Sequence, residues 1–466
     1  MSAHVVILVG LAVCLSLLRA PLLGKQSPPS IWTLPVLLGY VGVAVAMAQS
    51  ACRTGLRAAA GQDRRQFRRH QRLTVLGQWF LPAGLGGVLA SGYSRWIVES
   101  AGLGRIPLAD ELAAFAPFVL SLVLGWLATY PCFRQFRLQI FQRELLAGRP
   151  ARPPWTLREY MDYNVRHQLL FVLAPVGLIL LAVDLMELLL APRLSQSLRE
   201  PLISLASVAA AGGVFLLAPL MIARIWRTRR LEDGPLREGL ERMGRRLRVG
   251  ARDILVWRTG GMIANAAVMG LLRPLRYVLI SDMLLEHLDR RQVEAVFAHE
   301  ATHIAQHHIL YSLMFAFSSA VLTVAAAAVV GQLWPLPEHA VEGLALGLLA
   351  VTWAFGYGWI SRRFERQSDV WSAWAMGGDS RVPQDRLITV EGAASFANAL
   401  QRIAQLSGLP LVQRNWRHGC VAARIQHVLM LGAAGGSRSR IDRVVRRIKI
   451  GLWAAAALAA AALVFP

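Results

Sequence analysis

Two histidines and a glutamate in one short stretch have the spacing of a metal-dependent hydrolase site. The stretch reads Ala298-His299-Glu300-Ala301-Thr302-His303. On an α-helix, His299 and His303 are about one turn apart and project from the same face, so both imidazoles can bind one Zn²⁺. Glu300 points about 100° away around the helix axis. Its carboxylate then lies beside the metal, where a general base for an attacking water belongs.

A carboxylate later in the chain is a candidate for the third zinc ligand, because two histidines alone do not complete a zinc site. Glu365 and Asp369 have i,i+4 spacing, so Glu365 can bind the metal while Asp369 orients a ligand from behind. Two apolar runs, 309–333 and 343–360, form a hairpin that returns the chain to the face of the membrane it left. This topology places Glu365 near the zinc helix and is the main reason for choosing it.

The elements that position the motif can also be predicted. Asp289 is a good N-cap with Gln292 three residues later, so the zinc helix should begin at this point. His307 and His308 continue the histidine run, and both are expected on the surface at the end of this helix. Three strands rich in Val, Ile and Leu should precede the helix, at 252–257, 263–269 and 276–280.

The composition is that of a membrane protein. Hydrophobic residues make up 55% of the 466 positions and charged residues only 17%, which excludes an acidic disordered chain and a coiled coil. The 4 cysteines include no Cys-x-x-Cys pair, which argues against a disulfide framework. Apolar runs long enough to span a bilayer precede residue 226, at 3–22, 31–52, 73–94, 112–133, 169–191 and 201–225.

The positive charge indicates the orientation of these spans. The chain has 50 Lys and Arg against 28 Asp and Glu, a net charge of +22. Arginines concentrate in the connections 53–72 and 134–168, and such connections are usually cytoplasmic. The N-terminus and the segment after Arg224 should therefore face the cytoplasm. Because these arginines flank spans and accompany no nucleic-acid motif, the expected partner is the lipid bilayer and not a nucleic acid.

These observations predict a mainly α fold. We expect a polytopic α-helical membrane protein that carries a small α+β domain with the zinc motif. The predicted parts are a membrane domain with about six spans (1–225), a first protease segment (226–308), a transmembrane hairpin (309–360), a second protease segment (361–447) and an apolar tail (448–466). The tail is short and Ala-rich, so the sequence leaves open whether it spans the membrane.

Residues 226–430 resemble the M48 family of membrane zinc metallopeptidases. Four pieces carry the resemblance in the family's order: Asn265-Ala266-Ala267, Tyr277 to Leu288, His299-Glu300-Ala301-Thr302-His303, and Ser361 through Asp369. A later segment, Trp416-Arg417-His418-Gly419 through Arg424-Ile425, resembles the family's His-Pro and Arg-Ile segment. Here Gly419 replaces the proline, which leaves the role of His418 open between a catalytic residue and a surface histidine.

The resemblance implies a set of roles. His299, His303 and Glu365 would bind one zinc ion, Glu300 would be the catalytic base, and Asp369 would support a ligand from behind. Substrate would bind along the edge strand at Asn265, Ala266 and Ala267, and His418 would stabilise the oxyanion. The resemblance also implies that the small α+β domain is a zincin-like metalloprotease domain of the gluzincin type, with the activity of a zinc metalloendopeptidase.

We therefore expect a zinc-dependent endopeptidase at the cytoplasmic membrane face, acting on polypeptides and above all on membrane proteins in quality control. The many arginines and few lysines favour a bacterial inner membrane. Three alternatives stay open: a CaaX-type prenyl-protein endopeptidase, a zinc-binding membrane sensor or scaffold without turnover, and an intramembrane protease of the site-2 kind. The last fits least well, since the motif helix begins with several charged residues. The sequence does not indicate an oligomeric state.

Overall fold

A computed structural model describes most of the chain. The described residues are 9, 31–61, 63–148, 152–190, 192, 195–377, 387–407, 410–412 and 414–464. The expected first span, 3–22, lies outside this part of the chain apart from Val9. The chain divides into two units, Met1–Trp226 and Arg227–Pro466.

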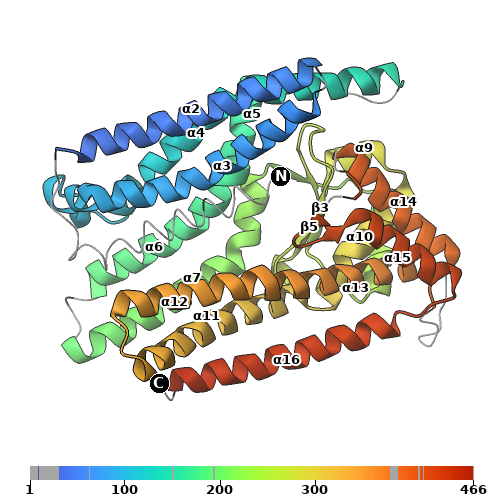
Figure 1. The fold of residues 1–466 in the computed structure, drawn as a ribbon. Coiled ribbons are helices and arrows are strands. Elements are labelled where there is room, and N and C mark those ends of the chain that lie inside the picture. The colour runs from blue at the N-terminus through green and yellow to red at the C-terminus, as the bar shows by residue number, and fades with distance from the viewer. Residues whose placement is uncertain are drawn as a thin grey trace. The chain divides into compact units, whose positions relative to one another are not determined.

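The first unit is built from long apolar helices (Figure 1). Its core lies where α2, α3 and α4 pack together, around Tyr40, Leu85 and Phe118. Short π-helical segments interrupt or extend several helices, and a 3-10 turn, η4 (Leu103–Arg105), precedes α4. The helices are α2 (Thr33–Gly61), α3 (Arg64–Val88), α4 (Ala109–Leu146), α5 (Leu157–Asn164), α6 (Phe171–Leu190) and α7 (Gln196–Ile225).

The second unit begins with a four-stranded sheet in the order β1-β2-β4-β3. β2 and β4 are parallel and the other pairs are antiparallel. The three predicted strands are confirmed with small shifts of their ends, while β1 was not predicted. The strands are β1 (Thr228–Arg230), β2 (Asp253–Trp257), β3 (Ala266–Met269) and β4 (Tyr277–Ser281).

Helices of the second unit cover this sheet and extend beyond it. They are α8 (Pro235–Arg246), α9 (Asp282–His287), α10 (Arg290–Ala305), α11 (His308–Leu333), α12 (Glu338–Val351), α13 (Gly358–Met376), α14 (Val390–Leu406), α15 (Val421–Ala433) and α16 (Ser439–Val464). A π-helical segment, η8 (Thr352–Tyr357), joins α12 to α13 without a break in the helical path. Two short strands, β5 (Arg414–Asn415) and β6 (Gly419–Cys420), form a hairpin before α15.

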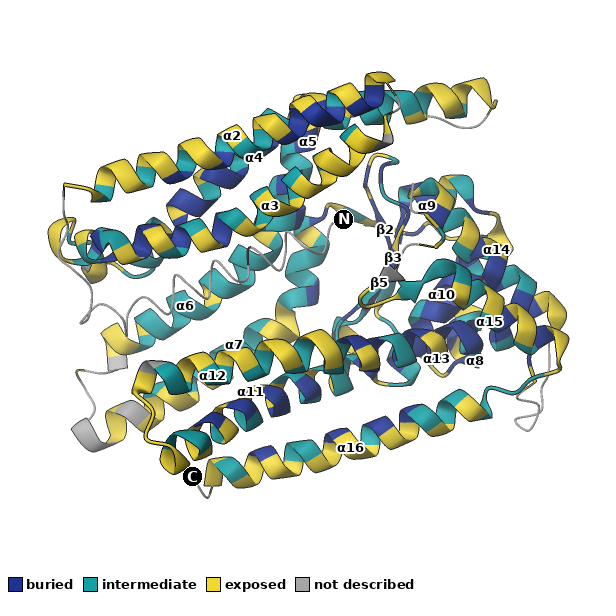
Figure 2. Cartoon of the chain, in the orientation of Figure 1, coloured by how far each residue is buried: buried dark blue, intermediate teal, exposed yellow. Residues whose placement is uncertain are grey.

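Within the described residues, eight helices are long and apolar enough to cross a membrane. Five belong to the first unit, and the others are His308–Leu333, Ala340–Met376 and Ser439–Val464. Exposed residues run along much of α12 and α16 (Figure 2), as expected of helices whose apolar side chains contact lipid. The predicted fold class, a polytopic helical membrane protein with a small sheet-containing domain, is confirmed.

The core of the second unit forms where the sheet packs against α10. Val278 and Ile280 of β4 are buried together with Val293 and Ala298 of α10. Ser372 of α13 donates its hydroxyl to the Ala295 carbonyl at 2.7 Å, which ties α13 to the same helix. α10 is therefore held rigidly between the sheet and α13.

Candidate metal centre

The capped N-terminus of α10 fixes where its histidines lie. Asp289 accepts from the Gln292 backbone N–H at 2.8 Å, and the Gln292 side chain accepts from the Asp289 backbone in return. This is the predicted capping box. One turn apart near the end of the helix, His299 and His303 have ring centroids 5.2 Å apart. His299 is buried and stacks on Phe396 of α14.

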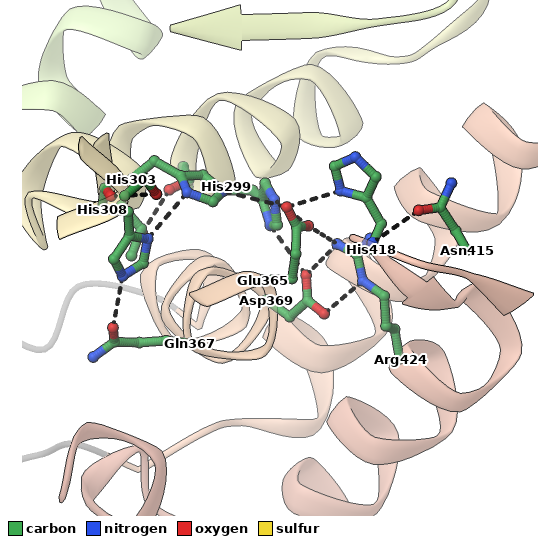
Figure 3. A network of polar contacts seen from close by, with 12 residues as sticks. His299, His303, His308, Glu365, Gln367, Asp369, Asn415, His418 and Arg424 are labelled. Atoms are coloured by element: carbon green, nitrogen blue, oxygen red, sulfur yellow. Dashed lines mark hydrogen bonds and ion pairs between the residues drawn. The ribbon is translucent and has the colours of Figure 1, made fainter. Parts of the chain in front are cut away.

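Glu365 of α13 lies opposite both histidines (Figure 3). Its Oε2 atom is 3.5 Å from His299 Nε2, and its Oε1 atom is 3.9 Å from His303 Nε2. One ligand atom from each of the three residues lies within 4.8 Å of the others. Ligands of a tetrahedral zinc ion lie roughly 3.4 Å apart at bond lengths of about 2.1 Å. The donor set and its spacing therefore fit a zinc ion with only a small contraction.

A charged network supports His299 from behind. Its Nδ1 atom lies 3.0 Å from Asp369 Oδ1, one turn after Glu365 on α13. Arg424 of α15 donates two hydrogen bonds to the Asp369 carboxylate, from Nε at 2.8 Å and from Nη2 at 2.6 Å. The Nη2 atom also lies 3.3 Å from Glu365 Oε2. Arg424 thus holds the carboxylates of Asp369 and Glu365 in position. The sequence assigns it no role, because nothing in the spacing of the residues distinguishes one arginine in a basic stretch from its neighbours.

A neutral network supports His303. Its Nδ1 atom lies 3.0 Å from Nδ1 of His308, whose Nε2 atom lies 2.9 Å from Oε1 of Gln367. Since Nε2 of His303 faces Glu365, its Nδ1 atom is the one that can donate to His308, and His308 then donates to Gln367. The Gln367 amide donates in turn to Asp442 of α16 at 2.6 Å.

The prediction that His308 is a surface residue was wrong. Its side chain is only 2% exposed and stacks on Phe364 with ring centroids 4.2 Å apart. α10 ends at Ala305, and His307 adopts a left-handed backbone with φ 55°. This turn leaves His307 exposed and directs His308 inward, so a histidine one position out of helical register reaches the site.

The two networks set different protonation states for the two histidines. Burial lowers the pKa of His299, but its contacts with Asp369 and Glu365 outweigh burial and raise the pKa to about 10. Burial lowers the pKa of His303 to about 4, although the charge of Glu365 partly opposes this. Without metal at neutral pH, His299 is therefore protonated and His303 is neutral.

Glu300 has the proton affinity of a base that works near neutrality. Burial raises the pKa of its carboxyl to about 7, and the nearby positive charge of His299 partly offsets the rise. A carboxylate with a pKa close to the ambient pH can both accept and return a proton. On α10 it directly follows His299, so the backbone holds it next to the metal ligands.

His418 reaches the site from the β5–β6 hairpin. Its Nδ1 atom lies 2.8 Å from Glu365 Oε1, and 47% of the side chain is exposed. The Asn415 side chain accepts from the His418 backbone N–H at 3.0 Å and shapes the turn. Gly419 has φ +77°, a value that proline cannot adopt, which explains why glycine stands here in place of the family's proline.

The predicted substrate-binding segment lies at an edge of the sheet. Ala266 and Ala267 begin β3, which pairs with β4 on one side and with no strand of the described residues on the other. Asn265 is exposed, and its backbone exchanges hydrogen bonds with Ser281. β3 also contacts α10, the helix that carries the zinc motif.

Comparison with known proteins finds one matching family, over the part of the chain that contains this site. Residues 231–409 match the model of peptidase family M48. A solved structure titled "Crystal Structure of S. mikatae Ste24p" is similar over 86% of this chain and 100% of that chain, with a TM-score of 0.48 and 14% sequence identity. The curated proteins give no match. The part of the chain that matches peptidase family M48, residues 231–409, therefore contains the His299, His303 and Glu365 cluster.

Proposed function

We propose that the protein is a zinc-dependent endopeptidase that cleaves polypeptides at the cytoplasmic face of a membrane. The observation that carries the proposal is the cluster of His299, His303 and Glu365 with Glu300 on the same helix, inside a domain of a metallopeptidase family. Eight helices able to cross a membrane support an integral membrane location. The arginine-rich connections support a cytoplasmic site.

His299, His303 and Glu365 would hold the zinc ion, and Asp369 with Arg424 would fix the orientation of two of these ligands. Zinc supplies Lewis acidity that polarises a carbonyl and makes a water molecule more acidic. Glu300 accepts the proton of the attacking water on its carboxylate and returns it to the amine of the leaving peptide. Its pKa of about 7 suits both steps.

Two further groups would act on the substrate. A peptide added in extended form to the free edge of β3, at Asn265, Ala266 and Ala267, would be aligned by backbone hydrogen bonds. β3 contacts α10, so a peptide on this edge would lie near the zinc motif. His418 is half-exposed beside Glu365 and can donate a hydrogen bond to an oxyanion there.

Membrane proteins in need of removal are the proposed substrates. A catalytic domain joined to several spans meets polypeptides at the membrane surface, which favours a role in membrane-protein quality control. The arginine-rich, lysine-poor composition favours a bacterial inner membrane over a eukaryotic one, and therefore favours this role over cleavage of prenylated CaaX chains.

Replacing Glu300 by Gln tests the proposed chemistry. The amide cannot accept the proton, so hydrolysis of an unfolded membrane protein should fall by about 10³-fold while bound zinc stays at one ion per chain. Glu294→Gln is the matched control, since Glu294 lies on the same helix and pairs with Arg290 at 2.9 Å, away from the zinc ligands. Retained hydrolysis in the Glu300 variant would contradict the assignment of the base.

The same variant tests the proposed substrates. Glu300→Gln should hold substrates without cleaving them, so proteins trapped by it in cells can be identified. A trapped pool enriched in membrane proteins supports quality control, whereas a pool without them excludes it. Zinc bound by the wild type without cleavage of any trapped protein would favour a scaffold or sensor.

A further inference from the structure

We propose that α13 and α16 form a binding site for one anionic phospholipid, separate from the metal centre. The phosphate of the lipid would lie among arginines, and an acyl chain would follow an apolar groove between the two helices. α13 and α16 contact each other in the second unit (Figure 1). The site is defined by two connected cavities on these helices.

The first cavity is strongly basic. It has a volume of about 550 Å³, and its lining includes Arg362, Arg363, Arg366, Arg440 and His427. Among the described residues, no acidic side chain lines this cavity. Four guanidinium groups around one hollow repel one another unless an anion joins them, and guanidinium groups match phosphate oxygens with paired hydrogen bonds.

None of these arginines has an ion-pair partner among the described residues. Arg362 donates to the Trp416 carbonyl at 2.8 Å, and Arg363 stacks on the Trp359 ring with its guanidinium carbon 4.3 Å from the centroid. Carbonyls and aromatic faces position a guanidinium group without neutralising it. The positive charge of the cavity is therefore uncompensated.

The nearby carboxylates are committed elsewhere. Asp369, on the same helix as three of the arginines, is held by two hydrogen bonds from Arg424. Asp442 of α16 accepts from Gln367 at 2.6 Å and from Trp371 at 2.8 Å. Neither carboxylate lines the basic cavity. Within the described residues, the charge of the cavity therefore favours an anion from outside the protein.

The second cavity explains why the ligand would be a lipid. It has a volume of about 430 Å³ and is lined by Trp359, Ile360, Val444, Ile448, Gly451 and Leu452, together with Arg447. Val444 lines both cavities, so the apolar groove continues from the basic one. Both helices belong to stretches long and apolar enough to cross a membrane.

A free phosphate ion would use only the basic end. A phospholipid matches both ends, because its phosphate lies at the border of the membrane and its acyl chain lies within the apolar part. Clusters of arginine next to a span attract anionic lipid with a free energy that adds up over the charges. The arrangement therefore favours an anionic phospholipid over a zwitterionic one.

Lipid titration of the full-length protein in detergent tests the proposal. Native mass spectrometry would count bound dioleoyl phosphatidylglycerol and dioleoyl phosphatidylcholine. We expect one tightly bound phosphatidylglycerol and at least tenfold weaker binding of phosphatidylcholine. The double variant Arg366→Gln with Arg440→Gln removes the positive charges of two exposed side chains. It should weaken the binding of phosphatidylglycerol by about 10- to 30-fold.

A matched variant separates a site from a general charge effect. Arg443→Gln with Arg446→Gln removes the same charge from exposed positions of α16 that line neither cavity. It should change phosphatidylglycerol binding by less than threefold. Equal weakening in both double variants would show diffuse attraction of charge and overturn the proposal.

The groove is tested by filling it. A Cβ atom added at Gly451 meets no atom within 4 Å, so a side chain can start there without a backbone clash. The indole ring of Gly451→Trp would then occupy the path of the acyl chain. It should weaken phosphatidylglycerol about tenfold. Unchanged lipid binding in this variant, or inorganic phosphate or polyglutamate binding as tightly as the lipid, would overturn the lipid assignment.

Discussion

The two histidines of the candidate metal centre are one turn apart on α10, yet the protein supports them in opposite ways. Behind His299 lie Asp369 and Arg424, a buried ion pair. Behind His303 lie His308 and Gln367, which are neutral hydrogen-bonding groups. The first support raises the pKa of its histidine to about 10, while the pKa of the other is lowered to about 4.

The two supports therefore have different effects on the histidines that they contact. The charged support increases the electron density on one ligand and holds a proton in place of the metal. The neutral support fixes the orientation and tautomer of the other ligand without adding charge. A site with two charged supports would hold two protons and compete more strongly against zinc.

The largest effect should be on the pH dependence of zinc binding. Below pH 10 His299 carries a proton that zinc must displace, whereas His303 carries none above about pH 5. Zinc affinity should therefore rise at least tenfold per pH unit from pH 7.5 to 9, with one proton released from His299 and none from His303. Competition with a chelator measures the zinc affinity, and calorimetry in buffers of different ionisation enthalpy measures the number of protons released. A zinc affinity that does not change with pH in this range would contradict the difference between the two histidines.

Removing the charged support should be the next largest effect. Asp369→Asn keeps the shape but removes the carboxylate that orients His299 and increases its basicity. Zinc should therefore bind 10- to 100-fold more weakly at pH 8, even though the competing proton on His299 is lost. The slope of affinity against pH should also flatten. Glu391→Gln, an exposed carboxylate on α14, is the control and should leave both unchanged. If the variant yields less folded protein but its zinc affinity still rises with pH as in the wild type, Asp369 has a purely structural role.

Removing the neutral support should have a smaller effect. His308→Phe keeps the stacking on Phe364 but removes the acceptor for His303, so zinc affinity should fall about tenfold with the pH slope retained. Its neighbour provides the control, since His307 is exposed and His307→Asn suits the left-handed backbone there. An altered slope in the His308 variant would mean that both supports act through charge.

The smallest effect should come from the hairpin that carries His418. Gly419→Ala places a side chain at φ +77° and should lower the free energy of unfolding by about 1 kcal/mol. Hydrolysis should fall more than zinc affinity, because His418 moves while the three ligands stay. Chemical denaturation and a zinc competition assay measure the two quantities. A fall in zinc affinity equal to the fall in hydrolysis would assign His418 to the metal support.

Local sequence was sufficient for much of the site. The capping box of Asp289 and Gln292 sets the start of α10, and helical periodicity then places His299, Glu300 and His303, because these effects act within a few residues. Glu365 was identified from the membrane topology, because a hairpin of two spans must return the chain to the membrane face that it left. The apolar runs likewise predicted most of the spanning helices, because the bilayer sets their length.

Only the tertiary structure decided the groups that arrive from other elements. Arg424 comes from α15, and Asp442 comes from α16, 75 residues after Gln367 along the chain. His308 enters the site because the chain turns at His307, which breaks the helical register on which the sequence argument depended. The sequence by itself determined most of the candidate metal chemistry, because two of the three proposed ligands and the proposed base lie on one helix. The groups that support the two histidines, and the basic cavity, depend on how the helices pack. The spacing of residues along the chain does not reveal this packing.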